Sequence, residues 1–304
     1  MSRQLAGRSI LITGASSGIG AATAIACARE GMNLLLAARR AARLAEVAAA
    51  CQAAGAEAGR RSGEVVSAKN SRGTSGGGVV TVGCDIDREA DVAALFGRAD
   101  ESFGRLDAVL ANAGWGVYGP IETIEESLAR AMFETNVFAT LRCMREAMAR
   151  FRRQGGGHLL VTVSVLSETA LPRHGIYSAT KAAQDAIAAA LRAEAAAAGI
   201  HVSTIHPIGT RTEFFDAAHR ATSSGQTAPG PSDEGGRKPH SPEKVARAIV
   251  RCLRRPRPEV WPSPLSRFGV AAMTAFPRLA GWVLRRAEAQ RQSGRNAAVP
   301  RSQP

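Results

Sequence analysis

A tyrosine and a lysine four residues apart, Tyr177 and Lys181, are the residues of this chain best suited to proton transfer. Positions i and i+4 share one face of a helix, so the phenol and the ammonium can point into the same space. A free phenol has a pKa of about 10. An ammonium about 4 Å away, at an effective dielectric constant of about 20, stabilises the phenolate by about 4 kcal/mol. That energy would bring the phenol pKa to about 7, where the group can serve as acid or base at an alcohol or carbonyl oxygen.

Ser164, thirteen residues before Tyr177, is the predicted hydrogen-bond partner of the reacting oxygen. The Tyr177–Lys181 spacing alone also fits a surface helix, in which a half-buried tyrosine lies beside a lysine that extends to solvent. Other parts of the chain must therefore decide between the two interpretations.

Composition indicates a globular protein with one large or two small domains, since 304 residues are 45% hydrophobic and 21% charged. The five cysteines are scattered without a metal-ligand spacing, and no N-terminal signal peptide is evident. Both features predict a cytoplasmic protein with neither disulfides nor a metal site.

The net charge of +13 is concentrated near the C-terminus. Residues 237–304 hold 15 Lys and Arg against 3 Asp and Glu, whereas residues 1–236 hold 24 against 23. The nearly neutral body argues against a nucleic-acid-binding protein.

The N-terminal segment has the pattern of a nucleotide-binding βαβ unit. An apolar strand is expected over 8–13, a glycine-rich turn over 14–20, a helix over 21–30 and a second strand over 33–37. Glycines in such a turn let the backbone approach a pyrophosphate, which the N-terminus of the helix then stabilises.

The same alternation of strands and helices continues along the chain. It predicts an α/β fold with a single Rossmann-type, doubly wound parallel sheet of about seven strands, flanked by helices on both faces. The Gly/Ser-rich residues 55–78 are expected to be a flexible insertion. Further strands are expected over 79–84, 108–111, 158–164, 201–206 and 259–261, and helices over 40–54, 88–103, 124–153, 177–198 and 241–254.

Four separated motifs resemble those of the short-chain dehydrogenases/reductases. They are TGASSGIG at Thr13–Gly20, NAG at Asn112–Gly114, the Ser164–Tyr177 spacing and YSATK at Tyr177–Lys181. The resemblance extends from about Arg8 to Trp261 and implies a catalytic domain over residues 1–261. Ser167, ten residues before Tyr177, does not have the serine spacing of that family.

The resemblance implies a role for each matching residue. Tyr177 would be the general acid or base, Ser164 would bind the substrate oxygen, and Lys181 would hold the nicotinamide ribose. Asn136 would anchor a water that links Lys181 to solvent. The implied cofactor-binding residues are Gly14, Ser16, Ser17, Gly18, Ile19 and Gly20 in the turn, Asp85 and Ile86 at the adenine, Asn112, Ala113 and Gly114 beside the cofactor, and Pro207 and Thr212 after the sixth strand.

Two local features bear on the cofactor. Ile208 stands where the family has a glycine after Pro207, and Gly209 follows it. After the second strand the chain has Ala38 and Arg39, where an acidic residue would bind the ribose 2′-hydroxyl of NAD. A guanidinium binds phosphate well, so Arg39 predicts NADP(H). The alternative is that Arg39 and Arg40 are solvated residues at a helix start.

The C-terminal part is expected to contain a segment over the substrate, residues 213–240, and a basic amphipathic helical extension, residues 262–304. The extension would pack over the substrate mouth or a partner subunit, or bind an anionic membrane surface. Pro277 and Arg278 in its middle argue against a membrane span.

These observations predict an NADPH-dependent carbonyl reductase, or the reverse alcohol dehydrogenase, with a lipophilic small-molecule substrate such as a steroid or ketoacyl compound. The resemblance also implies a homo-oligomer. Two alternatives remain at this stage: a non-catalytic NADP(H)-binding sensor and a peripheral membrane scaffold on the same fold.

Overall fold

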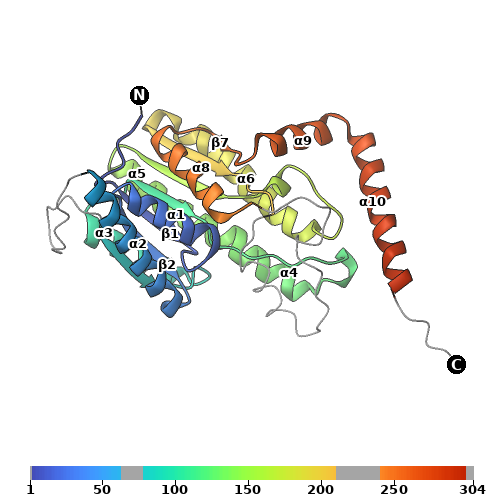
Figure 1. Ribbon diagram of the computed structural model, residues 1–304, viewed down its shortest axis with the longest axis horizontal. Helices are drawn as coiled ribbons and strands as arrows, with labels where there is room; N and C mark the ends of the chain where they lie inside the picture. Colours follow the sequence, from blue (N-terminus) through green and yellow to red (C-terminus); the bar gives the residue numbers. More distant parts are fainter. Residues whose placement is uncertain (1, 63–77, 210–239, 299–304) are drawn as a thin grey trace.

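The computed structural model describes residues 2–62, 78–209 and 240–298 (Figure 1). Seven strands form one sheet in the order β3-β2-β1-β4-β5-β6-β7, and every neighbouring pair is parallel. The expected doubly wound sheet is thus confirmed. The chain order reverses beside β1, whose neighbours are β2 and β4, and ligands of such sheets bind at this position. The strands are β1 (Ser9–Thr13), β2 (Asn33–Ala38), β3 (Val79–Gly83), β4 (Ala108–Ala111), β5 (Gly157–Thr162), β6 (Ile200–Ile205) and β7 (Glu259–Val260).

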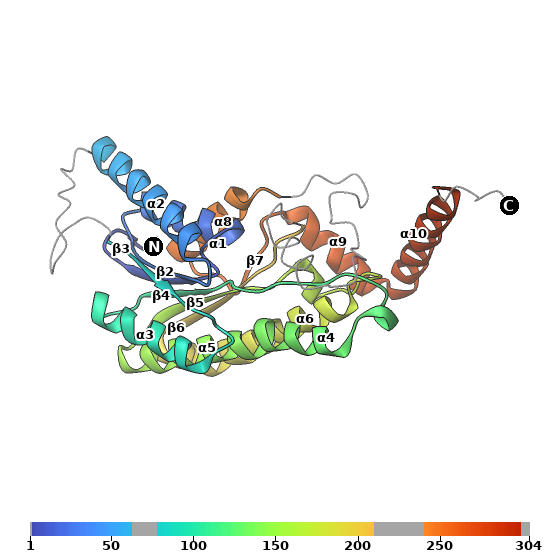
Figure 2. The ribbon, with the colours of Figure 1, turned by 90° about the horizontal axis from the view of Figure 1, so that it is seen from below.

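Helices cover both faces of the sheet because successive strand residues point to opposite sides. Ile10 and Ile12 pack toward α1, α2 and α8, whereas Leu11 packs toward α3, α5 and α6 (Figure 2). All three side chains are fully buried. The helices are α1 (Gly18–Arg29), α2 (Ala41–Ser62), α3 (Glu89–Phe103), α4 (Glu126–Phe133), α5 (Thr140–Arg153), α6 (Gly175–Ala195) and α8 (Pro242–Arg254).

Helix α2 corrects the prediction of a flexible insertion over 55–78, because residues 55–62 continue the helix. The remainder of that insertion, 63–77, lies outside the described residues. Helix α2 packs along α1, and a Cβ on Gly55 would meet the carbonyl oxygen of Ala28 in ordinary contact at 3.5 Å. The helix therefore continues through a glycine-containing stretch that the sequence did not indicate as helical, although glycine is a weak helix former.

One other element agrees with the sequence-based prediction and one differs. The long helix expected over 124–153 is continuous from Glu126 to Arg153, and it contains a π-helical segment at Glu134–Ala139 between α4 and α5. Strand β5 ends at Thr162, and Ser164 begins a 3-10 turn at Val165–Ser167 instead of ending the strand.

Helices α9 (Pro264–Ala275) and α10 (Pro277–Ala298) follow β7 and form an arm at the edge of the molecule (Figures 1 and 2). The backbone turns at Phe276, and Pro277 then begins α10, where a missing N–H costs no helical hydrogen bond. No helix in the described ranges is long and apolar enough to cross a bilayer.

Candidate active site

Tyr177 and Lys181 lie on the buried face of α6, as their spacing predicted. They are 8% and 3% exposed, and the Lys181 Nζ atom lies 5.8 Å from the centroid of the Tyr177 ring. The ammonium donates hydrogen bonds to the carbonyl oxygen of Thr162 at 2.9 Å and to Gln184 Oε1 at 2.8 Å. The interpretation of a solvated lysine on a surface helix is therefore wrong.

Burial alters the acidity of both groups. It lowers the pKa of the Lys181 ammonium from 10.5 to about 7. It also raises the pKa of Tyr177 well above 10, and hydrogen bonding with Ser164 offsets only part of that increase. The chain by itself therefore does not produce the low phenol pKa expected from the sequence, because the loss of solvation outweighs the hydrogen bond with Ser164. The protonated phenol that results is a proton donor.

Ser164 is positioned by the 3-10 turn that it begins. Its Oγ atom accepts a hydrogen bond from the backbone N–H of Leu166 at 3.1 Å. Ser167 turns away from Tyr177, with its Oγ atom 2.8 Å from the carbonyl oxygen of Ser164 and 2.9 Å from Asp185 Oδ2. Ser167 therefore supports the backbone of Ser164 and does not compete with it.

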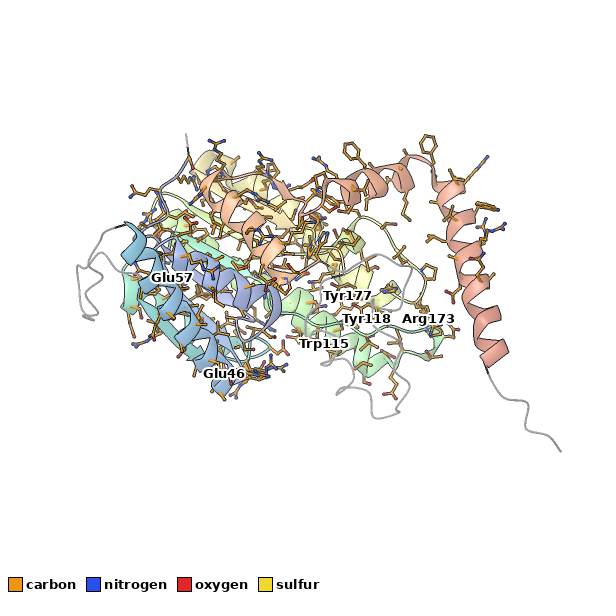
Figure 3. All side chains as sticks on the ribbon, in the orientation of Figure 1. Glu46, Glu57, Trp115, Tyr118, Arg173 and Tyr177 are labelled. Atoms are coloured by element: carbon orange, nitrogen blue, oxygen red, sulfur yellow. The ribbon has the colours of Figure 1, made fainter. Side chains whose placement is uncertain are left out.

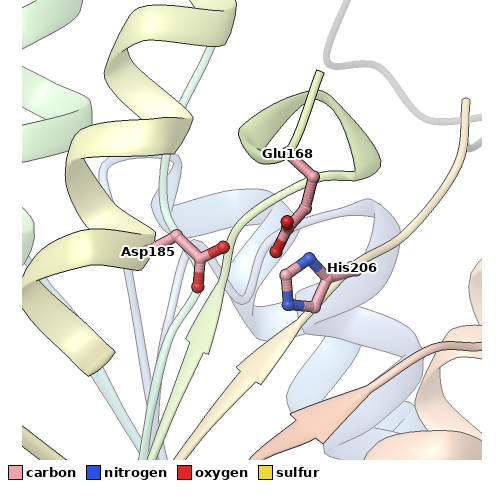
Figure 4. Close-up of side chains that lie close together, drawn as sticks. All are labelled: Glu168, Asp185 and His206. Atoms are coloured by element: carbon pink, nitrogen blue, oxygen red, sulfur yellow. The ribbon is translucent and has the colours of Figure 1, made fainter. Parts of the chain in front are cut away.

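A polar cluster that the sequence did not indicate lies behind this turn (Figure 4). Glu168, Asp185 and His206 come from the end of the turn, from α6 and from the residue after β6, and their nearest ligand atoms lie within 4.8 Å of one another. Burial and the nearby Asp185 carboxylate raise the pKa of Glu168 above its usual value. His206 is buried, stacks on Trp261 at 4.3 Å and bonds to Thr204 Oγ1 at 2.9 Å.

These residue types can bind metals, but the hydrogen bonds in the cluster explain their placement without an ion. Ser167 connects Asp185 and His206 to the carbonyl oxygen of Ser164. The cluster was missed because its members are far apart in sequence and come together only in the folded chain.

Asn136 joins α6 to the loop after β4. Its amide donates to the carbonyl oxygen of Trp115 at 2.8 Å and to Thr180 Oγ1 at 3.0 Å, and its Oδ1 accepts from the N–H of Trp115 at 3.0 Å. A Cβ on Gly114 would lie 2.8 Å from that Oδ1, so only glycine fits here. These contacts position the loop; the water-anchoring role stays a prediction. The π-helical segment around Asn136 is of a type often found at functional sites.

The glycine-rich turn and the NAG motif interlock. Asn112 donates to the carbonyl oxygen of Thr13 at 3.2 Å, and the Thr13 hydroxyl accepts from the N–H groups of Asn112 and Ala113. Gly14 has a φ of 65°, and a Cβ on Gly20 would lie 2.4 Å from the carbonyl oxygen of Gly14. Glycine is therefore required for the turn to close against the loop after β4.

The N-terminus of α1 fits the phosphates of a nucleotide cofactor. Ser17 is its N-cap but makes no side-chain cap hydrogen bond, and the first turn, which includes Gly18, Ile19 and Gly20, contains no acidic residue. The backbone N–H groups of that turn are suited to an anion.

Two arginines follow β2, and the phosphate-binding role predicted for Arg39 stays a prediction. Arg40, not Arg39, donates to the turn, with its Nη2 atom 3.2 Å from Ser16 Oγ and 2.9 Å from Ser17 Oγ. Arg39 is exposed, and its charge partly counters the burial that raises the pKa of Asp87. The adjacent arginines after the second strand were the sequence signal for both positions.

The other described cofactor residues of the prediction, Asp85, Ile86 and Pro207, follow the ends of strands β3 and β6. Asp85 follows β3, its N–H donates to Asp91 Oδ2 at 3.0 Å, and Ile86 is 8% exposed. Pro207 is buried after β6, and its carbonyl oxygen accepts from the N–H of Val165 at 3.1 Å. Thr212 and residues 213–239 of the predicted substrate segment lie outside the described residues.

An apolar cluster adjoins the Tyr177 ring (Figure 3). Tyr118 meets that ring edge to face, with centroids 5.6 Å apart, and Val117 and Met132 pack beside it. Trp115 and Leu166 add partly buried surface to the cluster. Side chains next to the reacting group are therefore mainly aromatic and aliphatic.

Comparisons with known proteins agree with this geometry. The family described as short chain dehydrogenase matches residues 8–70 and 56–222. The chain is 33% identical over 221 residues to the uncharacterized oxidoreductase Lin0452 of Listeria innocua, covering 72% of this chain and 81% of that protein. It is 31% identical over 220 residues to the uncharacterized oxidoreductase YbbO of Escherichia coli K12, covering 71% of each.

Solved structures of similar proteins contain bound nicotinamide cofactors. A short chain dehydrogenase/reductase from Burkholderia phymatum in complex with NAD has a TM-score of 0.75 at 23% identity, covering 91% of this chain and 96% of that one. An alcohol dehydrogenase from Thermococcus sibiricus complexed with 5-hydroxy-NADP has a TM-score of 0.64 at 28% identity, covering 84% and 95%. Both types of nicotinamide cofactor thus occur among the structural neighbours.

Proposed function

The chain belongs to the short-chain dehydrogenase/reductase family, and we propose that it is an NADP(H)-dependent oxidoreductase that interconverts a ketone and a secondary alcohol. The observation that carries this proposal is the buried arrangement of Ser164, Tyr177 and Lys181 at the carboxyl ends of the strands. A purely structural role would not account for a buried ammonium beside a buried phenol, because burying both polar groups is costly.

In this proposal a bound nicotinamide cofactor supplies the hydride. Tyr177 donates its phenolic proton to the carbonyl oxygen, and the Ser164 hydroxyl donates a hydrogen bond to the same oxygen. Lys181 binds the ribose hydroxyls through the donor that Thr162 and Gln184 leave unused, since an ammonium has three. The raised pKa of Tyr177 keeps the phenol protonated in the cofactor-free chain, which is the form that can donate a proton.

The apolar cluster around Tyr177 supports a lipophilic substrate, because its side chains would pack against hydrocarbon on either side of the carbonyl. The test is NADPH oxidation with a panel of ketosteroids, ketoacyl thioesters, aldehydes and sugars. Tyr177→Phe should lower kcat by at least about 100-fold, the lower range for a general acid, and leave NADPH binding intact.

Tyr118→Phe is the matched control, since Tyr118 is the other tyrosine of the chain and touches the Tyr177 ring. It should change KM for the substrate more than kcat. Retention of most of the activity in Tyr177→Phe would refute the assignment of Tyr177 as the proton donor.

The preference for NADP(H) is supported by the arginines after β2. Strand β2 ends at Ala38, which has no carboxylate. The Arg40 guanidinium is held beside the glycine-rich turn by hydrogen bonds to the hydroxyls of Ser16 and Ser17. A guanidinium there can bind a ribose 2′-phosphate, with Arg39 adding positive charge.

Replacing Arg40 with alanine should therefore weaken NADPH binding about tenfold or more, the equivalent of about 1.4 kcal/mol, and change NADH binding little. Arg43→Ala is the control, because Arg43 is exposed on α2, three residues after Arg40, and pairs with Glu46 at 3.0 Å. An equal loss with both cofactors in Arg40→Ala would show that Arg40 only stabilises the turn.

A further inference from the structure

The outer surface of α9 and α10 is the largest concentration of exposed apolar side chains in the described part of the chain. Eight large hydrophobic residues are exposed among all the described residues, and six of them lie on these two helices or at their junction. Phe268 is 73% exposed and Trp282 is 53% exposed. The six residues are Leu265, Phe268, Phe276, Leu279, Trp282 and Val283.

Their spacing places them on one side of each helix. Leu265 and Phe268 are separated by three residues on α9, and Leu279, Trp282 and Val283 follow the i, i+3, i+4 pattern on α10. Figure 3 shows aromatic rings standing on the side of α9 away from the sheet. An amphipathic arm with its apolar side outward requires a partner, since patches of this kind mark interaction sites.

The opposite side of the arm already faces the protein. On α9, Ser266 is buried and Met273 is half-buried. On α10, Leu284 is half-buried, and the Glu288 carboxylate lies 3.8 Å from the guanidinium of Arg173, which precedes α6. The contact with the catalytic domain is therefore made by the inner side, and it leaves the outer side uncovered.

Positive charge accompanies the outer apolar side. Residues 262–290 contain four arginines and a single acidic residue, Glu288, which turns inward to Arg173. Arg278, Arg285 and Arg286 are exposed, and the Arg286 guanidinium lies 5.5 Å from the centroid of the Trp282 ring. The fourth arginine, Arg267, is also exposed, although it approaches Glu259 at 3.7 Å.

We propose that this outer side of α9 and α10 binds the surface of an anionic phospholipid bilayer, with both helices lying in the plane of the headgroups. The aromatic and aliphatic side chains enter the boundary between headgroups and acyl chains, and the arginines contact lipid phosphates. A second copy of the chain is a poorer occupant. In a two-fold interface the same surface meets itself, which would bring the two sets of arginines together.

The experiment is co-sedimentation of the full-length protein with vesicles of phosphatidylcholine containing phosphatidylglycerol, compared with vesicles of phosphatidylcholine alone. Wild-type protein should bind the anionic vesicles several-fold more strongly, and added salt should weaken that binding, because salt screens the arginine contribution. Phe268→Ser with Trp282→Ser should reduce binding at least tenfold, and so should Arg278→Gln with Arg285→Gln.

Matched changes on the body serve as controls. Phe138 is 50% exposed in the π-helical segment, and Arg152 and Arg153 are exposed at the end of α5. Phe138→Ser and the double change Arg152→Gln with Arg153→Gln should leave vesicle binding unchanged. Trp282→Phe should retain binding but lose the quenching of tryptophan fluorescence by brominated lipid.

Three results would overturn the proposal. Full-length protein could stay in the supernatant with anionic vesicles at low salt, or the body variants could lose binding as fully as the arm variants. A third result is a wild-type dimer in sedimentation velocity that dissociates in Phe268→Ser with Trp282→Ser, without any vesicle binding. That third result would assign the surface to a second copy of the chain. All of these outcomes are independent of the oxidoreductase activity.

Discussion

Changing Lys181 to methionine is expected to remove a rise in stability with pH that the wild-type protein shows. The lysine is 3% exposed, and burial lowers its pKa from 10.5 to about 7. Between these values the unfolded chain holds the lysine proton and the folded chain does not. Raising the pH therefore favours the folded state, and this contribution is lost when the pH falls toward about 7.

The magnitude follows from the two pKa values. One unit of pKa corresponds to about 1.36 kcal/mol. With a folded-state pKa of about 7, linkage predicts that the free energy of unfolding increases by about 2.5 kcal/mol between about pH 6 and about pH 9. Because Lys181 is almost fully buried, solvent does not screen this effect appreciably.

The assay is urea unfolding of the cofactor-free protein at several pH values across that range, for wild type, Lys181→Met and Lys244→Met. The difference between wild type and Lys181→Met should change with pH by about 2.5 kcal/mol, whereas Lys244→Met, which leaves Lys181 intact, should follow wild type. A constant offset is not informative, because methionine also removes the hydrogen bonds to Thr162 and Gln184. Parallel curves for wild type and Lys181→Met would refute the account of a desolvated ammonium.

Two further predictions concern the supports of the site. Gly20→Ala should lower the free energy of unfolding by about 1–3 kcal/mol, because its Cβ would lie 2.4 Å from the carbonyl oxygen of Gly14. Gly97→Ala on α3, where a Cβ meets nothing within 4 Å, should instead stabilise by about 0.5–1 kcal/mol in the same urea assay; equal effects of the two changes would contradict the steric argument. Asp185→Asn should lower kcat about fivefold, which corresponds to an activation barrier higher by roughly 1 kcal/mol. The effect would pass through Ser167, which bonds both to Asp185 and to the carbonyl oxygen of Ser164, and so would disturb the position of Ser164. NADPH binding should be unchanged in a fluorescence titration. A loss confined to NADPH affinity would place the role of Asp185 elsewhere.

Much of the fold could be predicted from sequence because its signals are local. Alternating apolar strands and helical segments specified the seven-stranded parallel sheet, and the order of the glycine-rich turn, Asn112–Gly114, Ser164 and Tyr177–Lys181 indicated the family. The four-residue spacing of Tyr177 and Lys181 was sufficient to place both on one helix face.

Interactions between distant segments were decided only by the tertiary structure. Helix α2 packs along α1 and continues through Gly55 to Ser62, and the π-helical segment contains Asn136, whose side chain bonds to Trp115 and Thr180. A spacing rule likewise cannot show which of two neighbouring arginines reaches the glycine-rich turn, since that depends on where α2 begins.

The acidity of the site depends on the fold in the same way. Sequence placed an ammonium near a phenol and so predicted a lowered phenol pKa, whereas the folded chain raises the pKa of Tyr177 and lowers that of Lys181. The solvation of a side chain depends on all the groups packed around it. Around α6 these groups come from β5, the turn after Ser164 and the π-helical segment. The sequence by itself thus determined which groups are present and on which helix face they lie. Only the packed structure decided how much water they lose, and with it their charge.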